Sequence, residues 1–227
     1  MALTAKLHTN REYERELQSV RDNLLKMTGF VEQMITDSVK SLLSNDSKLA
    51  AKTIETDHEV NRLEIETDDL CLLILARRQP LASDLRFITL AMKMVTDLER
   101  IGDLTVNICE RTIVIDKTPP PRTGETILEM GELVKTMIHR AIDAFVTNDV
   151  GKAEQVWDED EAVDAAYIDL CKDVQGNMRE DPEWVERGIH LQAVAKFLER
   201  IGDHCTNLAE QVVFLVKGKD IRHIGKR

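Results

Sequence analysis

The chain has few of the residues that build sheets, tight turns or disulfide frameworks. Aromatic residues make up only 4% of its 227 residues, and it has 10 glycines and 5 prolines. This scarcity argues against a β-rich fold and favours long helices. The 4 cysteines are widely spaced and form no C-x-x-C pair, which is typical of reduced thiols in a cytoplasmic protein.

Three further absences limit the function. No apolar run approaches the roughly 20 residues that a membrane-spanning helix needs, and no charged-then-apolar signal segment begins the chain, so we expect a soluble protein without a transmembrane segment. The formal net charge of −11 disfavours nucleic acid as a partner. The sequence has no G-x-x-x-x-G-K-[ST] loop and no G-x-S-x-G elbow, so we predict no enzyme.

What the chain does have is a repeat. Residues 98–103 read L-E-R-I-G-D, and the same six residues recur one hundred positions later at 198–203. The match continues through an asparagine and a glutamate, at Asn107/Asn207 and Glu110/Glu210. The chain is therefore an internal duplication, and each half should form the same fold and the same kind of site.

Apolar residues recur every three or four positions in six long stretches, which predicts six amphipathic helices. The first should run from about 12 to 44, the second should end near 78 and the last near 216. Turn-forming and capping residues separate them, at Asn45-Asp46-Ser47, Gln79-Pro80, Ser83-Asp84, Asn148-Asp149 and Asp181-Pro182.

Three antiparallel helices with one apolar face each can bury those faces only against each other. The predicted fold class is therefore all-α, with two tandem three-helix bundles related by internal duplication. The bundles should occupy residues 1–117 and 123–227, joined by a proline-rich linker at 118–122.

Acidic side chains gather opposite the apolar face of the repeated segment. At about 100° per residue, each copy of the motif places its acidic and amide side chains in one strip of its helix, and neither strip contains a lysine. The strip of the third helix holds Glu99, Asp103, Asn107 and Glu110, and that of the sixth holds Glu199, Asp203, Asn207 and Glu210. The preceding helix of each half has a companion strip, formed by Asp57, Asn61, Glu64 and Asp68, and by Asp160 and Asp164. In an antiparallel helix pair the two strips of each half can meet.

Such a gathering of carboxylates suits cations that prefer oxygen ligands, such as Mg, Mn, Fe or Zn. His204, next to Asp203, is the one histidine near enough to add a ligand. Gly102 and Gly202 each weaken a helix interior, so their recurrence indicates close helix packing beside the site. The alternative is a metal-free helical adaptor whose acidic strips are solvated or dock basic partner surfaces. A ferritin-like di-iron centre is disfavoured because it needs Glu-x-x-His pairs inside a bundle.

The doubled L-E-R-I-G-D motif, each copy with an upstream D-x-x-x-D/N element, resembles the PhoU family of phosphate-transport regulators over essentially the whole chain. The resemblance implies tandem three-helix bundles as PhoU repeats, and metal ions or multinuclear metal clusters at the E/D-x-x-x-D motifs. The metal ligands that it implies are Asp57, Glu99 and Asp103 in the first half, and Asp160, Asp164, Glu199 and Asp203 in the second. Asn61 stands where the family has an acid, so the second half is expected to bind metal more strongly.

The same resemblance implies a function and partners. It predicts a cytoplasmic negative regulator of phosphate uptake and of the phosphate-starvation response, which couples a phosphate ABC transporter, through its ATPase or membrane components, to a sensor histidine kinase. Contact with the inner face of the membrane is expected only through those partners. Residual apolar surface and the dimers of the family predict a homodimer whose contact avoids the acidic strips. The sequence does not tell which metal is native, which face meets which partner, or whether phosphate or metal is sensed.

Overall fold

The computed structural model describes residues 2–115 and 123–218. Over these ranges the chain is helical and has no strand. The elements are α1 (Ala2–Ser44), α2 (Ser47–Arg78), α3 (Ala82–Ile115), α4 (Gly124–Thr147), α5 (Val150–Glu180), the 3-10 helix η1 (Pro182–Trp184) and α6 (Val185–Lys217). The predicted fold class, two tandem three-helix bundles, is confirmed. No helix in the described part of the chain is long and apolar enough to cross a membrane.

The same two-residue turn opens the second helix of each bundle. Asn45 and Asn148 adopt left-handed backbone conformations, with φ of 51° and 53°, which asparagine tolerates better than most residues. The side chains of the following Asp46 and Asp149 then accept hydrogen bonds from free backbone N–H groups at the starts of α2 and α5. An aspartate N-cap stabilises a helix by about 1 kcal/mol. Local chemistry thus sets these breaks, as the sequence predicts.

Other helix ends differ from the predictions. Helix α1 begins at Ala2 rather than near residue 12, and α3 begins at Ala82, so Ser83 lies inside its first turn instead of capping it. Asp181 caps the short helix η1 rather than α6 directly. The predicted linker at 118–122 lies outside the described residues, and the domain boundaries drawn from it stay a prediction.

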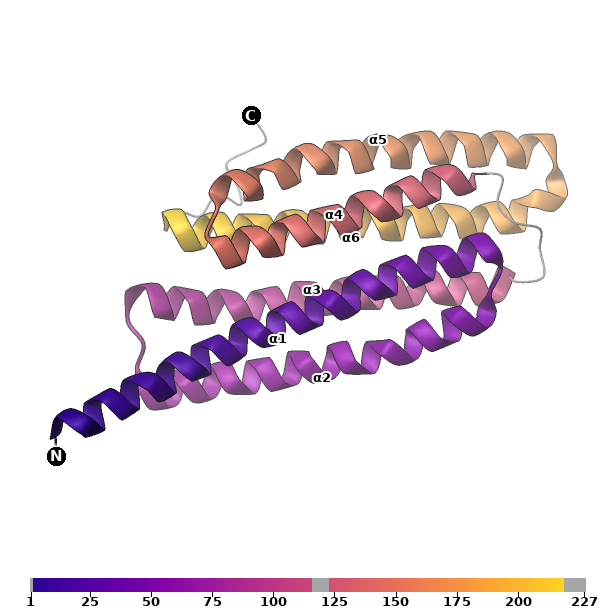
Figure 1. Cartoon of the computed structure of the whole chain (residues 1–227). Helices are drawn as coiled ribbons and strands as arrows, with labels where there is room; N and C mark the ends of the chain where they lie inside the picture. The colour runs from indigo at the N-terminus through magenta and orange to yellow at the C-terminus, as the bar shows by residue number, and fades with distance from the viewer. Residues whose placement is uncertain (1, 116–122, 219–227) are drawn as a thin grey trace.

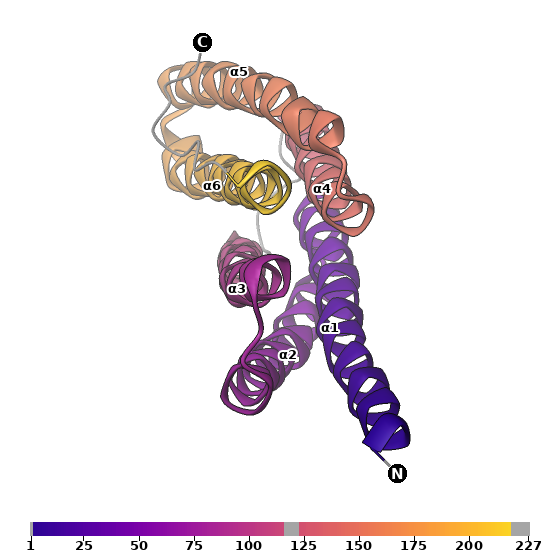
Figure 2. The ribbon, with the colours of Figure 1, turned by 90° about the vertical axis from the view of Figure 1, so that its left-hand side faces the viewer.

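The two bundles pack side by side rather than end to end. In Figure 1 helices α1 to α3 form one layer and α4 to α6 the other. Figure 2, which looks along the helices, shows α4 beside α1 and α6 beside α3, with α2 and α5 on the outside. Each inner helix therefore contacts its own equivalent in the other half, as in a two-fold symmetric dimer.

Close contacts join the two layers. The rings of Phe87 on α3 and Phe145 on α4 stack with centroids 5.6 Å apart. Gly131 on α4 packs against the side chain of Val39 on α1 so closely that an added Cβ would lie 2.8 Å from Cγ2 of Val39. The buried apolar residues of both bundles form a single cluster. The molecule therefore has one core that runs across the duplication.

Helices α3 and α6 run in opposite directions along each other (Figure 1). Nδ1 of His204 lies 2.9 Å from Oδ1 of Asp97, so the residue just before the first copy of the motif touches the residue just after the second copy. The two copies of the motif consequently lie side by side at the middle of the molecule.

Candidate functional site

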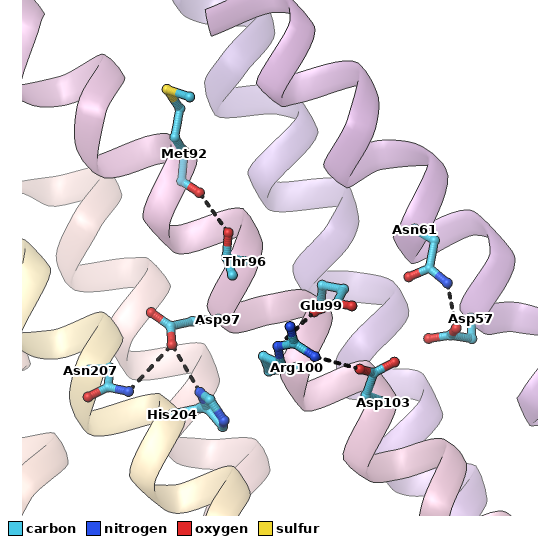
Figure 3. A network of polar contacts seen from close by, with 10 residues as sticks. All are labelled: Asp57, Asn61, Met92, Thr96, Asp97, Glu99, Arg100, Asp103, His204 and Asn207. Atoms are coloured by element: carbon cyan, nitrogen blue, oxygen red, sulfur yellow. Dashed lines mark hydrogen bonds and ion pairs between the residues drawn. The ribbon is translucent and has the colours of Figure 1, made fainter.

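The first acidic cluster lies where α2 meets α3. It consists of Asp57, Asn61 and Glu64 from α2 and Glu99 and Asp103 from α3. An added Cβ on Gly102 would lie 3.0 Å from Oδ1 of Asp57, so the glycine lets the two helices approach and places Asp57 against α3. Nδ2 of Asn61 donates a 2.7 Å hydrogen bond to Oδ2 of Asp57. Figure 3 shows Asp57 and Asn61 facing Glu99 and Asp103 across the helix pair.

The second acidic cluster repeats this arrangement where α5 meets α6. It consists of Asp160 and Asp164 from α5 and Glu199 and Asp203 from α6. An added Cβ on Gly202 would lie 3.1 Å from Oδ1 of Asp160, whose side chain belongs to a residue only 5% exposed. Both glycines of the motif are therefore sites of close helix packing beside an acidic cluster, as predicted.

Burial and mutual repulsion disfavour the ionised form of several of these acids. Burial raises the pKa of Asp57, which the Asn61 hydrogen bond lowers and the charge of Asp103 raises further. Burial also raises the pKa of Glu99, with a further contribution from Asp103. In the second cluster burial raises the pKa of Asp203, and Glu199 adds to the effect. Each cluster thus holds more negative charge than its surroundings compensate.

Among the described residues, each cluster forms ion pairs with one cationic side chain, Arg100 in the first and Lys196 in the second. Arg100 lies 3.4 Å from Oε2 of Glu99 through Nε and 3.3 Å from Oδ2 of Asp103 through Nη1, as Figure 3 shows. In the second cluster Nζ of Lys196 lies 2.5 Å from Oε2 of Glu199. The acidic strip predicted from the sequence begins at Glu199 and therefore does not include Lys196, which lies one turn earlier on the same face of α6.

The donor set of the first cluster suits a cation, although it is not assembled as a coordination sphere. Oδ1 of Asp57 and Oδ1 of Asn61 are buried and have no hydrogen-bond partner, and such oxygens are ligands that hard divalent cations prefer. Among the described residues, however, no three acidic, histidine or cysteine side chains converge as a metal site would require. A cation would have to draw these side chains together, and the metal ligands stay a prediction.

The far part of the second strip faces a different neighbour. His204 contacts Asp97 of α3 rather than the second acidic cluster, and Nδ2 of Asn207 lies 3.4 Å from the same Asp97 oxygen (Figure 3). Nε2 of Gln211 donates a 2.6 Å hydrogen bond to the other Asp97 oxygen. A cavity of about 550 Å³ adjoins this network between α3 and α6, with Lys93 on its wall. The acidic strip predicted on α6 is therefore divided. Its first part, Glu199 and Asp203, faces α5, whereas Asn207 contacts α3.

We predict that Asp57→Asn stabilises the cation-free protein at neutral pH. Because folding raises the pKa of Asp57, ionisation favours the unfolded chain, and stability falls as the pH rises through that raised pKa. An amide has no such penalty. In chelator, the urea midpoint of the variant should exceed that of the wild type at pH 7, and the difference should shrink as the pH falls toward 3.8, the ordinary pKa of aspartate.

The matched control is Asp69→Asn, on the exposed side of α2. It should leave the urea midpoint unchanged both at pH 7 and at the lower pH. A lower midpoint for Asp57→Asn at pH 7 would show that the carboxylate is stabilised in the folded protein rather than strained by burial.

Comparison with known proteins gives consistent matches along the chain. The family described as the PhoU domain matches twice, at residues 24–112 and 127–212. The chain is 40% identical over 219 residues to the phosphate-specific transport system accessory protein PhoU homolog of Pseudomonas aeruginosa, covering 96% of this chain and 90% of that one. It is 34% identical to the phosphate-specific transport system accessory protein PhoU of Escherichia coli K12, covering 99% and 93% of the two chains.

Solved structures of PhoU proteins have the same fold as this chain. The crystal structure of PhoU from Pseudomonas aeruginosa superposes with a TM-score of 0.87 at 39% identity, over 91% of this chain and 100% of that one. That of the phosphate transport system regulatory protein PhoU from Streptococcus pneumoniae superposes with a TM-score of 0.85 at 27% identity, over 92% and 98%.

Proposed function

The chain belongs to the PhoU family, and from this premise we propose that it is a negative regulator of phosphate uptake and of the phosphate-starvation response. The observation that carries the proposal is its similarity, over nearly the whole chain, to phosphate-specific transport system accessory proteins. In this proposal the protein couples a phosphate ABC transporter to a sensor histidine kinase when phosphate is plentiful. It works in the cytoplasm and meets the inner face of the membrane through those partners.

The architecture suits an adaptor that works by contact rather than by catalysis. The single core joins the two layers, so the body offers surfaces at fixed relative positions. The two acidic clusters repeat one arrangement on that body, around Gly102 and Gly202. We propose that divalent cations, from among Mg, Mn, Fe and Zn, bind these clusters and change which partner is favoured. We also propose a homodimer whose contact avoids the clusters, because two apposed acidic surfaces repel each other.

A metal-free adaptor is the second candidate, and a specific observation favours it. Arg100 and Lys196 already pair with acids of the two clusters, which reduces the need for a bound cation. In that case the clusters dock basic surfaces of partner proteins directly. Elemental analysis of the purified protein after exposure to these metals and dialysis separates the candidates, since only the first retains metal.

Deletion of the gene tests the regulatory proposal. The loss should switch on phosphate-scavenging genes in phosphate-replete medium, because nothing would then hold the sensor kinase in its inactive signalling state. A reporter fused to a phosphate-starvation promoter measures the effect, and the wild-type gene supplied in trans should restore repression. Deletion of the kinase as well should abolish the induction. Unchanged reporter activity in the single deletion strain would refute the assignment.

A further inference from the structure

The cavity of about 550 Å³ between α3 and α6 is separate from both acidic clusters. Among the described residues that line it, none belongs to either cluster. Pockets that bind small organic molecules commonly have volumes of about 300–1,000 Å³. Part of the wall is apolar and consists of Leu90 and Met92 of α3 and Phe214 of α6. The cavity is thus large enough for an organic ligand and offers it an apolar surface.

The rest of the wall is polar and mainly acidic. Asp68 of α2, Asp97 of α3 and Glu210 of α6 place three carboxylates around the cavity, and the exposed Lys93 compensates only one of them. Within the described ranges, no three acidic, histidine or cysteine side chains converge on a point where a metal ion could bind. Separated carboxylates beside an apolar surface instead suit an organic cation whose charged groups are spaced along a chain.

Two oxygen atoms of the wall residues have no hydrogen-bond donor. Nε2 of Gln211 donates to Asp97, which fixes the orientation of the amide, and its Oε1 is buried without a partner. Oδ1 of Asp68 is also buried and unpartnered, and burial raises the pKa of this carboxyl group. A buried acceptor without a donor is costly. A ligand with N–H groups would supply the donors that both side chains lack.

The other half of the duplication indicates that helix packing does not require these carboxylates. The repeated motif relates positions 100 apart on α3 and α6, so Asp97 corresponds to Phe197, whose ring packs against the apolar core. The equivalent turns before α2 and α5 relate positions 103 apart, so Asp68 corresponds to Cys171. The carboxylates at positions 68 and 97 are therefore specific to one end of the contact between α3 and α6, which favours a role other than packing.

We propose that this cavity binds a linear aliphatic polyamine, whose ammonium groups pair with the three carboxylates and whose methylene groups lie against the three apolar side chains. The α2 and α3 walls belong to the first bundle and the α6 wall to the second, so the ligand bridges the two layers. The inference goes beyond the proposed regulatory function, and it does not depend on metal binding at the acidic clusters.

Spermidine is the probe, and its binding to the purified full-length protein is measured by calorimetric titration. The buffer contains chelator and about 0.15 M salt, which screens exposed charges. The wild type should bind spermidine at one saturable site, and hexaamminecobalt(III), which has the same charge but no methylene groups, at least about tenfold more weakly. Asp68→Asn should weaken spermidine binding about tenfold, because it removes a charge-assisted hydrogen bond. Thr96→Trp should abolish the saturable binding by filling the cavity, and an unchanged circular dichroism spectrum would show that this variant is folded.

Asp69→Asn is the matched control, because it removes the same charge from the exposed neighbour of Asp68 on α2. It should change the affinity by less than about twofold. Equal weakening by both substitutions, or equal affinity for hexaamminecobalt(III), would show diffuse attraction to an acidic surface and overturn the inference. Binding of Nα-acetyl-lysine amide as tight as that of spermidine would also overturn it, because the cavity would then suit a lysine side chain of a partner protein. None of these results bears on the deletion phenotype, which tests the regulatory proposal separately.

Discussion

Leu98→Ala should lower the free energy of unfolding by about 3 kcal/mol, and Leu198→Ala by a similar amount. The two leucines begin the two copies of the repeated motif, and both are completely buried. Truncation removes apolar contacts and leaves a cavity that a close-packed helical core fills only in part. Because the buried residues of both bundles form one cluster, each variant should unfold in a single transition at a lower urea concentration than the wild type.

Leu85→Ala provides the control, since Leu85 is on the same helix as Leu98 and is 42% exposed. It should change the stability by less than about 0.5 kcal/mol. If Leu98→Ala instead produced two transitions, with the second at the wild-type midpoint, the bundles would be independent folding units and the shared core would have no energetic role.

Gly131→Leu should destabilise the protein by about 1–3 kcal/mol through overpacking of the contact between α1 and α4. The first added carbon would lie 2.8 Å from Cγ2 of Val39, and the rest of the side chain would need further space between two helices of different bundles. The thermal midpoint should fall. Exchange of backbone amide protons along α1 and α4 should become faster if the seam between the layers has loosened.

The same substitution at Gly176 is the control. Gly176 is also helical, but an added Cβ there would meet nothing within 4 Å, so Gly176→Leu should raise the stability by up to about 1 kcal/mol through better helix propensity. Equal effects at the two positions would mean that the Val39 contact yields easily and that the layers are not closely fitted.

Features encoded by neighbouring residues could be predicted from the sequence. The apolar periodicity gave the helices, and the Asn-Asp pairs gave the starts of α2 and α5, because an N-cap acts within one turn. The meeting of the acidic strips also followed from helical periodicity and antiparallel pairing. The start of α3 could not be placed in this way, since Ser83 and Asp84 are both acceptable caps and Ala82 is the first residue of the helix.

Contacts between the bundles could not be predicted. The Asp97 and His204 contact joins residues 107 positions apart, and neither belongs to the six repeated residues. Lys196 was missed for a related reason. A lysine one turn before an acid is common on exposed helices. The Tyr167 ring, whose centroid lies 5.6 Å from Nζ of Lys196, belongs to another helix, so this contact could not be read from the sequence around Lys196.

The packing of α1 on α4 and of α3 on α6 has an evolutionary consequence. Each inner helix meets its own copy, so a shorter ancestral protein of one bundle could have formed the same body by pairing with itself, and gene duplication with fusion would then have preserved a dimer inside one polypeptide. Identical subunits must make every contact twice. In this chain the counterparts of Asp97 and His204 are Phe197 and Leu104, so the polar contact can form only once. Fusion allowed the two copies to acquire different residues. The two ends of the α3 and α6 contact therefore differ, which is impossible in a symmetric dimer.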